Sequence, residues 1–272
     1  MALAVPALKI PETIPLGRRL WWGLSDIAAL TKRNLLHLTR VPALLFFTAI
    51  QPIMFTLLFR YVFGGSIRTS AGSYVEYLLP GIIVQTGAFL SFATAVGLAE
   101  ELSKGVIDRF RSMPIARSAV LIARLVSDVV RTFVTVLIIV AVGYGVGFRF
   151  HTGSGQIIAM IVLSVGFGLA MACISSFIGL AIKDQEAVQA FGLVWVFPLT
   201  FASGVFVTVA SMPAWLAAFA RNNPVTIIAD AARNLSLGTP AGDALWLSVV
   251  WLIAIIVTFG ALAVRAYRRS SS

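Results

Sequence analysis

Ionisable side chains inside apolar stretches are the residues of this sequence that could carry protons or ions across a membrane. Asp128 and Arg131 lie three residues apart in the apolar run 120–148, and Arg124 precedes Asp128 by four residues. On a helix these three side chains share a face. They could act as a relay, as in ion-coupled transporters, but two flanking arginines would keep the carboxylate charged. We therefore favour an intrahelical charge network near a membrane interface.

The patterns that bind nucleotides or metals, or that activate a serine, are not found in the sequence. None of the lysines follows a glycine, which excludes the phosphate loop Gly-x4-Gly-Lys. The two histidines, His37 and His151, are far apart, and no His/Cys/Asp/Glu cluster has the spacing of a metal site. A Gly-x-Ser-x-Gly elbow is also missing. We expect a chain that is not an enzyme and that binds no metal or cofactor itself.

A basic segment between two apolar runs, residues 100–117, reads EELSKGVIDRFRSMPIAR. Its apolar side chains recur at helical spacing, with charged residues such as Arg111 on the opposite face. The apolar face is formed by Val106, Ile107, Phe110 and Met113. Pro114 then stops the helix. The pattern predicts a short amphipathic helix that either docks on a partner protein or caps the bundle.

A second charged pair, Asp230 and Arg233, lies between the last two apolar runs. The stretches Trp215–Phe219 and Thr226–Ala232 are expected to be helical but are too short to cross a membrane, and Pro224 separates them. Irregular backbone at membrane depth requires cover by protein or a water-filled cavity. We predict two short re-entrant helices on the outer side, held by the Asp230–Arg233 pair rather than contacting a substrate.

Transmembrane helices are the elements that would hold these residues in place. Apolar residues make up 59% of the 272 residues and charged residues only 12%, against roughly 45–50% and about 25% in soluble domains. Six apolar runs are each long enough to cross about 30 Å of hydrocarbon. They extend approximately over residues 41–63, 77–98, 120–148, 156–182, 187–209 and 244–264. Because the runs are continuous rather than alternating, we predict an all-α integral membrane protein with six transmembrane helices.

The distribution of Lys and Arg predicts the orientation of these helices. Basic residues are concentrated before the first run, between the second and third, and after the sixth. Positively charged loops stay in the cytoplasm, so both termini are expected there, in a multi-pass protein of the cell (inner) membrane. Membrane orientation therefore accounts for the net charge of +10 without nucleic-acid binding.

Residues 18–40 read as an amphipathic helix with Leu24 and Ile27 on one face and Asp26 and Arg33 on the other. Such a helix lies in the membrane interface, although a cytosolic helix packed on the bundle is the alternative. The expected division is a cytoplasmic tail with this interfacial helix (1–40), a six-helix transmembrane domain (41–265) and a basic cytoplasmic tail (266–272).

Several of these segments resemble permease subunits of ABC-type exporters, a type-2 exporter class, and most closely the daunorubicin-resistance permease family. In the basic loop the similar residues are Glu101, Gly105, Arg109, Ser112, Met113, Pro114 and Arg117. In the outer segment they are Met212-Pro213-Ala214-Trp215, Asn223-Pro224-Val225, Asp230 and Arg233, with Gly147-Phe148-Arg149-Phe150 after the third run. The order of these motifs along the six runs extends the resemblance over nearly the whole chain.

The resemblance implies that the loop helix is a coupling helix that docks into a separate ATPase subunit. Two ATPase copies, holding ATP and magnesium, would serve two permeases, either two copies of this chain or one copy with a similar permease. The substrate would be a small hydrophobic or amphipathic molecule, drug-like or lipid-like, moved among membrane lipids. Candidate residues of its cavity are Gln51, Gln85, Phe89, Phe92, Phe197 and Phe201, although helix packing would also explain each aromatic residue. A non-transporting scaffold and an ion-coupled transporter are the alternatives.

Overall fold

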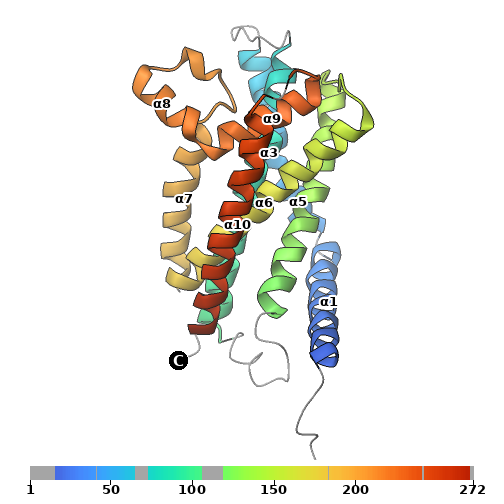
Figure 1. Cartoon of the computed structure of the whole chain (residues 1–272), viewed down its shortest axis with the longest axis vertical. Coiled ribbons are helices and arrows are strands. Elements are labelled where there is room, and N and C mark those ends of the chain that lie inside the picture. The colour runs from blue at the N-terminus through green and yellow to red at the C-terminus, as the bar shows by residue number, and fades with distance from the viewer. Residues whose placement is uncertain are drawn as a thin grey trace, which may run out of the picture.

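The computed structural model describes residues 16–40, 42–64, 73–105, 119–182, 184–240 and 242–269, and its regular elements are all helical (Figure 1). The helices are α1 (Leu16–Arg40), α2 (Pro42–Leu58), α3 (Tyr74–Ser103), α5 (Ala119–Val146), α6 (Ser154–Ile182), α7 (Gln185–Phe201), α8 (Ala214–Asn222), α9 (Pro224–Leu237) and α10 (Ala244–Arg269). A π-helical turn, η1 (Phe59–Phe63), continues α2, and a 3-10 turn, η2 (Val209–Ser211), precedes α8. The predicted amphipathic helix after residue 105 lies outside the described residues.

Four of these helices, α3, α5, α6 and α10, are long and apolar enough to cross a membrane. They match the second, third, fourth and sixth apolar runs of the sequence. The first and fifth runs correspond to α2 and α7, which have 17 residues each. Helix α10 continues past the expected end of the sixth run to Arg269, so the predicted basic tail begins inside a helix.

The fifth apolar run was predicted to remain helical to residue 209, and this prediction is wrong, because α7 ends at Phe201. The chain then bends at Ala202 and Ser203, turns over residues 204–206 and continues without regular structure to η2. The stretch is nevertheless buried from Ser203 to Phe206. The segment is apolar because it is buried, as a helix in the core is. Hydropathy alone therefore does not distinguish a buried irregular segment from a buried helix.

Helix α3 is the central element of the bundle and packs against α2, α5, α6, α7 and α9. Small residues allow α3 and α6 to approach closely. A Cβ atom at Gly87 would lie 3.0 Å from the Cα atom of Gly168, and one at Gly179 would meet the carbonyl oxygen of Ala95. Close packing of this kind holds transmembrane helices together without a hydrophobic driving force between them.

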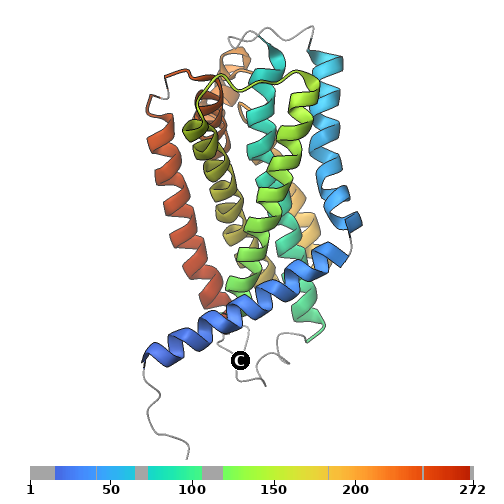
Figure 2. The ribbon, with the colours of Figure 1, turned by 90° about the vertical axis from the view of Figure 1, so that its right-hand side faces the viewer.

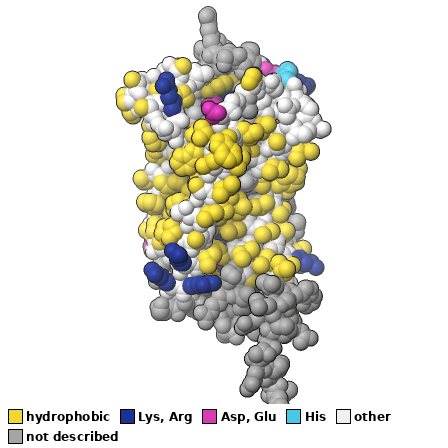
Figure 3. Space-filling view, viewed as in Figure 1, with side chains coloured by type: hydrophobic (Ala, Val, Ile, Leu, Met, Phe, Trp, Pro, Cys, Tyr) yellow, Lys and Arg dark blue, Asp and Glu magenta, His cyan; other side chains and the backbone are white. Residues whose placement is uncertain are grey.

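The two ends of the bundle differ in structure. Helix α1 crosses the lower end obliquely and packs mainly on α5 (Figure 2), while α8 and α9 lie at the upper end (Figure 1). These two helices replace the shorter stretches predicted around Trp215 and Thr226. On the face shown in Figure 3, hydrophobic side chains form a broad belt, with Lys and Arg side chains below it. The belt is the surface that a bilayer would cover.

Candidate functional site

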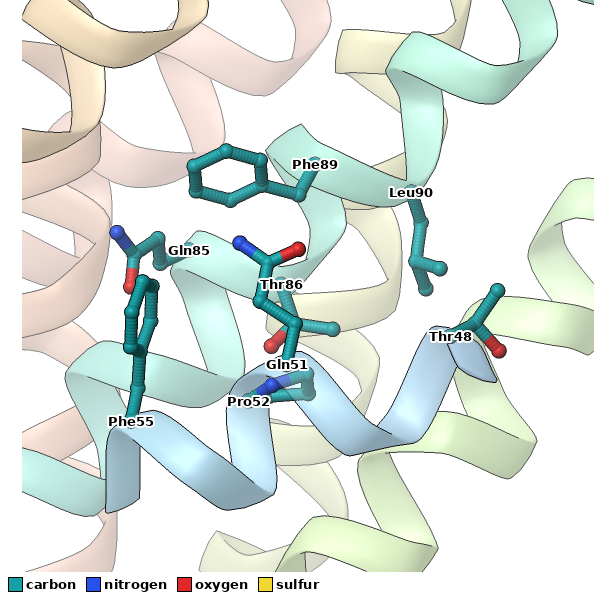
Figure 4. A pocket seen from close by; sticks show the side chains of 8 residues that line it. All are labelled: Thr48, Gln51, Pro52, Phe55, Gln85, Thr86, Phe89 and Leu90. Carbon is teal, nitrogen blue, oxygen red and sulfur yellow. The ribbon is translucent and has the colours of Figure 1, made fainter. Parts of the chain in front are cut away.

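A cavity of about 250 Å³ lies between α2 and α3 in the bundle (Figure 4). Its lining residues are Thr48, Gln51, Pro52, Phe55, Gln85, Thr86, Phe89 and Leu90. The Gln85 side chain is only 1% exposed, and its amide nitrogen has no hydrogen-bond partner among the described residues. The Thr86 hydroxyl, in contrast, donates to the Ile82 carbonyl oxygen at 2.7 Å. The cavity surface is mostly apolar, and the Gln85 side chain that lines it carries a buried amide nitrogen without a partner among the described residues.

Three of the six residues predicted for the cavity line it, namely Gln51, Gln85 and Phe89. The other three do not. The Phe197 ring packs edge-on against Phe89 at 5.5 Å between ring centroids and stacks on Phe201 at 5.3 Å. The Phe92 ring occupies the space above Gly192 of α7, where a Cβ atom would collide with it.

Sequence reasoning missed the aromatic residue on the α2 side of the cavity, Phe55. Its position carried a usable signal, since Gln51 and Phe55 are four residues apart and so are Gln85 and Phe89. Residues with this spacing share a helix face. This shared spacing predicts two helices that each present one amide and one aromatic ring on the same face. Figure 4 shows these two faces directed toward each other.

A second group of interacting residues surrounds Arg233 of α9, which is 5% exposed. Its Nε donates to the Tyr77 carbonyl oxygen at 2.7 Å, and its Nη2 donates to the carbonyl oxygens of Gly204 at 2.7 Å and Val205 at 3.0 Å. Its Nη1 lies 2.6 Å from Oδ1 of Asp230, which is the ion pair expected from the sequence. The guanidinium also lies 3.7 Å from the centre of the Tyr77 ring. Arg233 thus joins α9, α3 and the irregular segment after α7.

Further contacts satisfy the backbone of that irregular segment. The Tyr77 hydroxyl donates to the Gly204 carbonyl oxygen at 2.7 Å, and the Tyr74 hydroxyl donates to the Phe206 carbonyl oxygen at 3.0 Å. The Gly204 amide donates to Thr226 Oγ1 at 2.9 Å. Side chains from α3 and α9 therefore replace the hydrogen bonds that a helix would have supplied.

The Asn223-Pro224 pair fixes the start of α9 beside the end of α7. The Asn223 side chain accepts a hydrogen bond from the Val225 amide at 2.9 Å, which caps the helix, and Pro224 follows at the first helical position. The same side chain donates to the Leu199 carbonyl oxygen at 2.7 Å. Trp215 takes no part in this arrangement, because it lies on α8 with 75% of its surface exposed.

The carboxyl group of Asp230 is the exposed end of the arginine cluster, with 48% of its side chain accessible. Partial burial on α9 raises the pKa of the Asp230 carboxyl, and the adjacent Arg233 guanidinium acts in the opposite direction. The guanidinium, in contrast, is surrounded by backbone carbonyl oxygens. Its geometry suits fixing the backbone rather than binding a ligand.

The charged residues of α5 do not form the single network that their spacing predicts. Asp128 accepts from Thr94 Oγ1 at 2.7 Å and pairs with Arg131 Nη2 at 2.8 Å. Arg124 instead pairs with Glu101 of α3 at 2.9 Å. It reaches this partner across Gly97, where any side chain would collide with the guanidinium. The cross-helix partner could not be inferred from positions along one helix.

Of the residues predicted for the coupling loop, the structure describes Glu101 and Gly105. Glu101 lies in the last turn of α3 and pairs with Arg124, and Gly105 follows the helix with a positive φ of 64°. The remaining positions lie outside the described residues: Val106, Ile107, Arg109, Phe110, Arg111, Ser112, Met113, Pro114 and Arg117. The ion pair fixes one end of this loop to α5.

The apolar belt and the four long apolar helices define a multi-pass membrane protein. Its sequence matches the family of ABC-2 type transporters over residues 25–237. The match covers most of the chain, which therefore belongs to the ABC-2 type transporter permease family.

Individual relatives agree with this assignment. The chain is 32% identical to the daunorubicin resistance ABC transporter permease protein DrrB1 of Streptomyces coeruleorubidus over 241 residues, covering 88% of this chain and 85% of the relative. It is 27% identical to the doxorubicin resistance ABC transporter permease protein DrrB of Mycobacterium tuberculosis over 247 residues, covering 89% and 86%. It is also 27% identical to the putative transport permease ycf38 of Porphyra purpurea over 221 residues, covering 79% and 75%. The first two matches confirm the resemblance predicted from the sequence motifs.

Proposed function

We propose that this chain is the membrane permease subunit of an exporter driven by a separate ATPase. The observation that carries the proposal is the family match over residues 25–237 together with relatives that are named as drug-resistance permeases. The chain would move hydrophobic or amphipathic molecules, drug-like or lipid-like, out across the cell membrane. ATP and magnesium would be bound by two ATPase subunits, and a second copy of this chain or a similar permease would complete the assembly.

In the proposed arrangement six helices span the membrane, because α2 with η1 and α7 join the four long apolar helices. Both termini and the lower end in Figure 3 face the cytoplasm, as the basic residues there favour. Helix α1 lies in the cytoplasmic interface. Helices α8 and α9 form the re-entrant pair at the outer surface, with the Arg233 cluster covering the irregular backbone.

The cavity between α2 and α3 is the proposed substrate site. Its Phe55 and Phe89 side chains offer apolar aromatic surface, and the unpartnered Gln85 amide offers one buried donor. A planar apolar molecule with a carbonyl or hydroxyl oxygen fits this combination. The α3 helix connects the cavity to the coupling loop, since Gln85 and Glu101 belong to the same helix.

The proposed function predicts transport that depends on ATP and not on an ion gradient. Inside-out vesicles containing the chain and its ATPase should take up amphipathic aromatic probes, including daunorubicin, when ATP and magnesium are added. Uptake should persist after the proton gradient is collapsed, and the purified chain alone should not hydrolyse ATP. Loss of uptake on collapse of the gradient would indicate an ion-coupled transporter. If no ATPase co-purifies and none of the probes is taken up, the chain is a scaffold.

The Gln85→Leu variant separates a role in substrate binding from a role in the fold. A buried donor without a partner costs about 1–3 kcal/mol, so its removal is expected to leave the thermal stability unchanged or higher. Export of probes with an acceptor oxygen should nevertheless fall by up to about tenfold, as expected for one lost hydrogen bond. The measurements are initial uptake rates in vesicles and melting in detergent.

Gln189→Leu is the matched control, because Gln189 lies on the exposed surface of α7 away from the cavity. This variant should change neither export nor melting. If Gln85→Leu lowers the melting temperature and affects all probes equally, Gln85 serves packing and the cavity is not the substrate site.

A further inference from the structure

An open groove of about 480 Å³ lies between α1 and α5 and shares no lining residue with the proposed substrate cavity. Its lining residues are Leu24, Ile27, Ala28, Thr31, Lys32, Leu35, Leu36 and Val126. All but two of these side chains are apolar. The groove thus presents hydrocarbon-like surface at the end of the bundle where α1 crosses it (Figure 2).

Several apolar side chains of the groove remain largely exposed on the described chain. Leu24 is 65% exposed, Leu36 43% and Val126 39%. Helix α1 packs on the lower core through Leu30, which is buried, and through Ile27, which also borders the groove. The groove is therefore additional apolar surface beyond what holds α1 in place, and such surface is normally covered by a ligand, a partner or lipid.

The two polar residues of the groove have different roles. The Thr31 hydroxyl donates to the Ala123 carbonyl oxygen of α5 at 3.5 Å, a long contact that directs it toward the bundle. Lys32 has no ion-pair partner among the residues that the structure describes. A lysine at such a position buries its methylene groups along apolar surface and keeps its ammonium group at the polar boundary.

We propose that this groove binds one anionic phospholipid of the cytoplasmic leaflet, with an acyl chain along the apolar residues and the phosphate on Lys32. One cation beside a largely apolar channel complements an amphiphile with a single anionic head. A protein partner would instead require several polar contacts around the rim, whereas Thr31 and Lys32 are the only polar side chains among the described residues that line the groove. The cytoplasmic leaflet is rich in anionic lipids that basic residues at the surface attract.

The proposal rests on the orientation proposed above, in which α1 lies at the cytoplasmic surface, and not on the identity of the substrate. A lipid in this position would contact α1 and α5 together. Helix α1 is separated from α2, which lines the substrate cavity, by a single residue. The bound lipid would thus stabilise the packing of α1 on the bundle, next to the point where the chain continues into α2.

The test is native mass spectrometry of the full chain in mild detergent, titrated separately with phosphatidylglycerol and phosphatidylcholine. We expect the unmodified chain to retain one phosphatidylglycerol molecule in preference to phosphatidylcholine. Lys32→Glu should lower the apparent affinity for phosphatidylglycerol by about tenfold or more, because attraction becomes repulsion. Ala28→Trp, which fills the groove, should abolish retention of this molecule.

Arg221→Glu is the control, since it makes the same change of charge on exposed α8 at the opposite end. An equal loss in this control would show that net charge alone attracts lipid and would overturn the proposal. Equal binding of the two lipids, or retention in a folded Ala28→Trp variant, would overturn it as well. Melting in detergent identifies a variant that fails to fold, in which case Ala28→Phe replaces it. Because the readout requires neither ATP nor transport, failure of export leaves this result interpretable.

Discussion

Arg233→Met is expected to destabilise the outer end of the protein by about 2–6 kcal/mol, because buried backbone carbonyl oxygens lose their donor. Methionine is unbranched and apolar, so the carbonyl oxygens of Tyr77 and Val205 lose the donor that Arg233 supplies. The Gly204 carbonyl oxygen loses one of its two donors and keeps the Tyr77 hydroxyl. Each buried acceptor that loses its partner costs about 1–3 kcal/mol. The measurement is thermal unfolding in detergent, accompanied by export rates for several substrates, all of which should fall together.

Two further variants determine which property of Arg233 matters. Arg233→Lys keeps the charge beside Asp230 but supplies one nitrogen instead of three, so it should also be destabilised, though less than Arg233→Met. Arg221→Met removes an exposed arginine from the neighbouring helix and should change stability by less than about 0.5 kcal/mol. Unchanged melting of Arg233→Met would contradict a role in holding the backbone after α7.

Asp230→Asn tests the exposed end of the same cluster. Asparagine keeps a side-chain oxygen that can accept from Arg233 Nη1, and the Asp230 side chain is 48% exposed. The loss of stability should therefore be smaller than for Arg233→Met, and activity should fall alike for all substrates. A change in substrate preference with unchanged melting would show that Asp230 contacts the substrate directly.

The arginine cluster also shows which parts of the fold the sequence could predict. The long apolar helices follow from continuous apolar runs, and the break before α9 follows from Asn223-Pro224. The end of α7 could not be predicted in this way, because residues 203–206 are stabilised by Tyr77 and Arg233 from distant parts of the chain. The local sequence shows that such a segment is apolar. It does not show which distant side chains donate hydrogen bonds to its carbonyl groups.

The residues of the candidate cavity were partly predictable, because polar residues in apolar runs are conspicuous in the sequence whereas aromatic residues are not. Gln51 and Gln85 stand out as polar residues within apolar runs, and the structure places both in one cavity. The rings of Phe92 and Phe197 carried no comparable signal, since an aromatic residue in a membrane helix can face lipid, a neighbour or a cavity. Likewise, Arg124 was assigned to Asp128 from spacing, whereas packing of α3 on α5 brings it to Glu101.

Phe110→Ala is expected to uncouple the permease from its ATPase while leaving it inserted and folded. Phe110 lies outside the described residues, so the prediction combines helical spacing with the proposed function. Burial of a phenylalanine contributes about 1.5–3 kcal/mol, so its loss should weaken ATPase binding by about tenfold or more. Under the proposed function substrate-stimulated ATP hydrolysis should disappear, because the loop helix would be the contact that transmits motion from the ATPase to α3.

The structure adds a reason to expect that the fold survives this change. The Glu101–Arg124 ion pair fixes the end of α3 to α5 on the bundle side of the loop. Phe133→Ala is the matched control, since that ring is 42% exposed on α5 and should affect neither binding nor hydrolysis. The measurements are pull-down of the ATPase and melting of the permease in detergent. Full partner binding by a folded Phe110→Ala variant would disprove the docking role, whereas unfolding would show that the loop helix is a structural cap on the bundle.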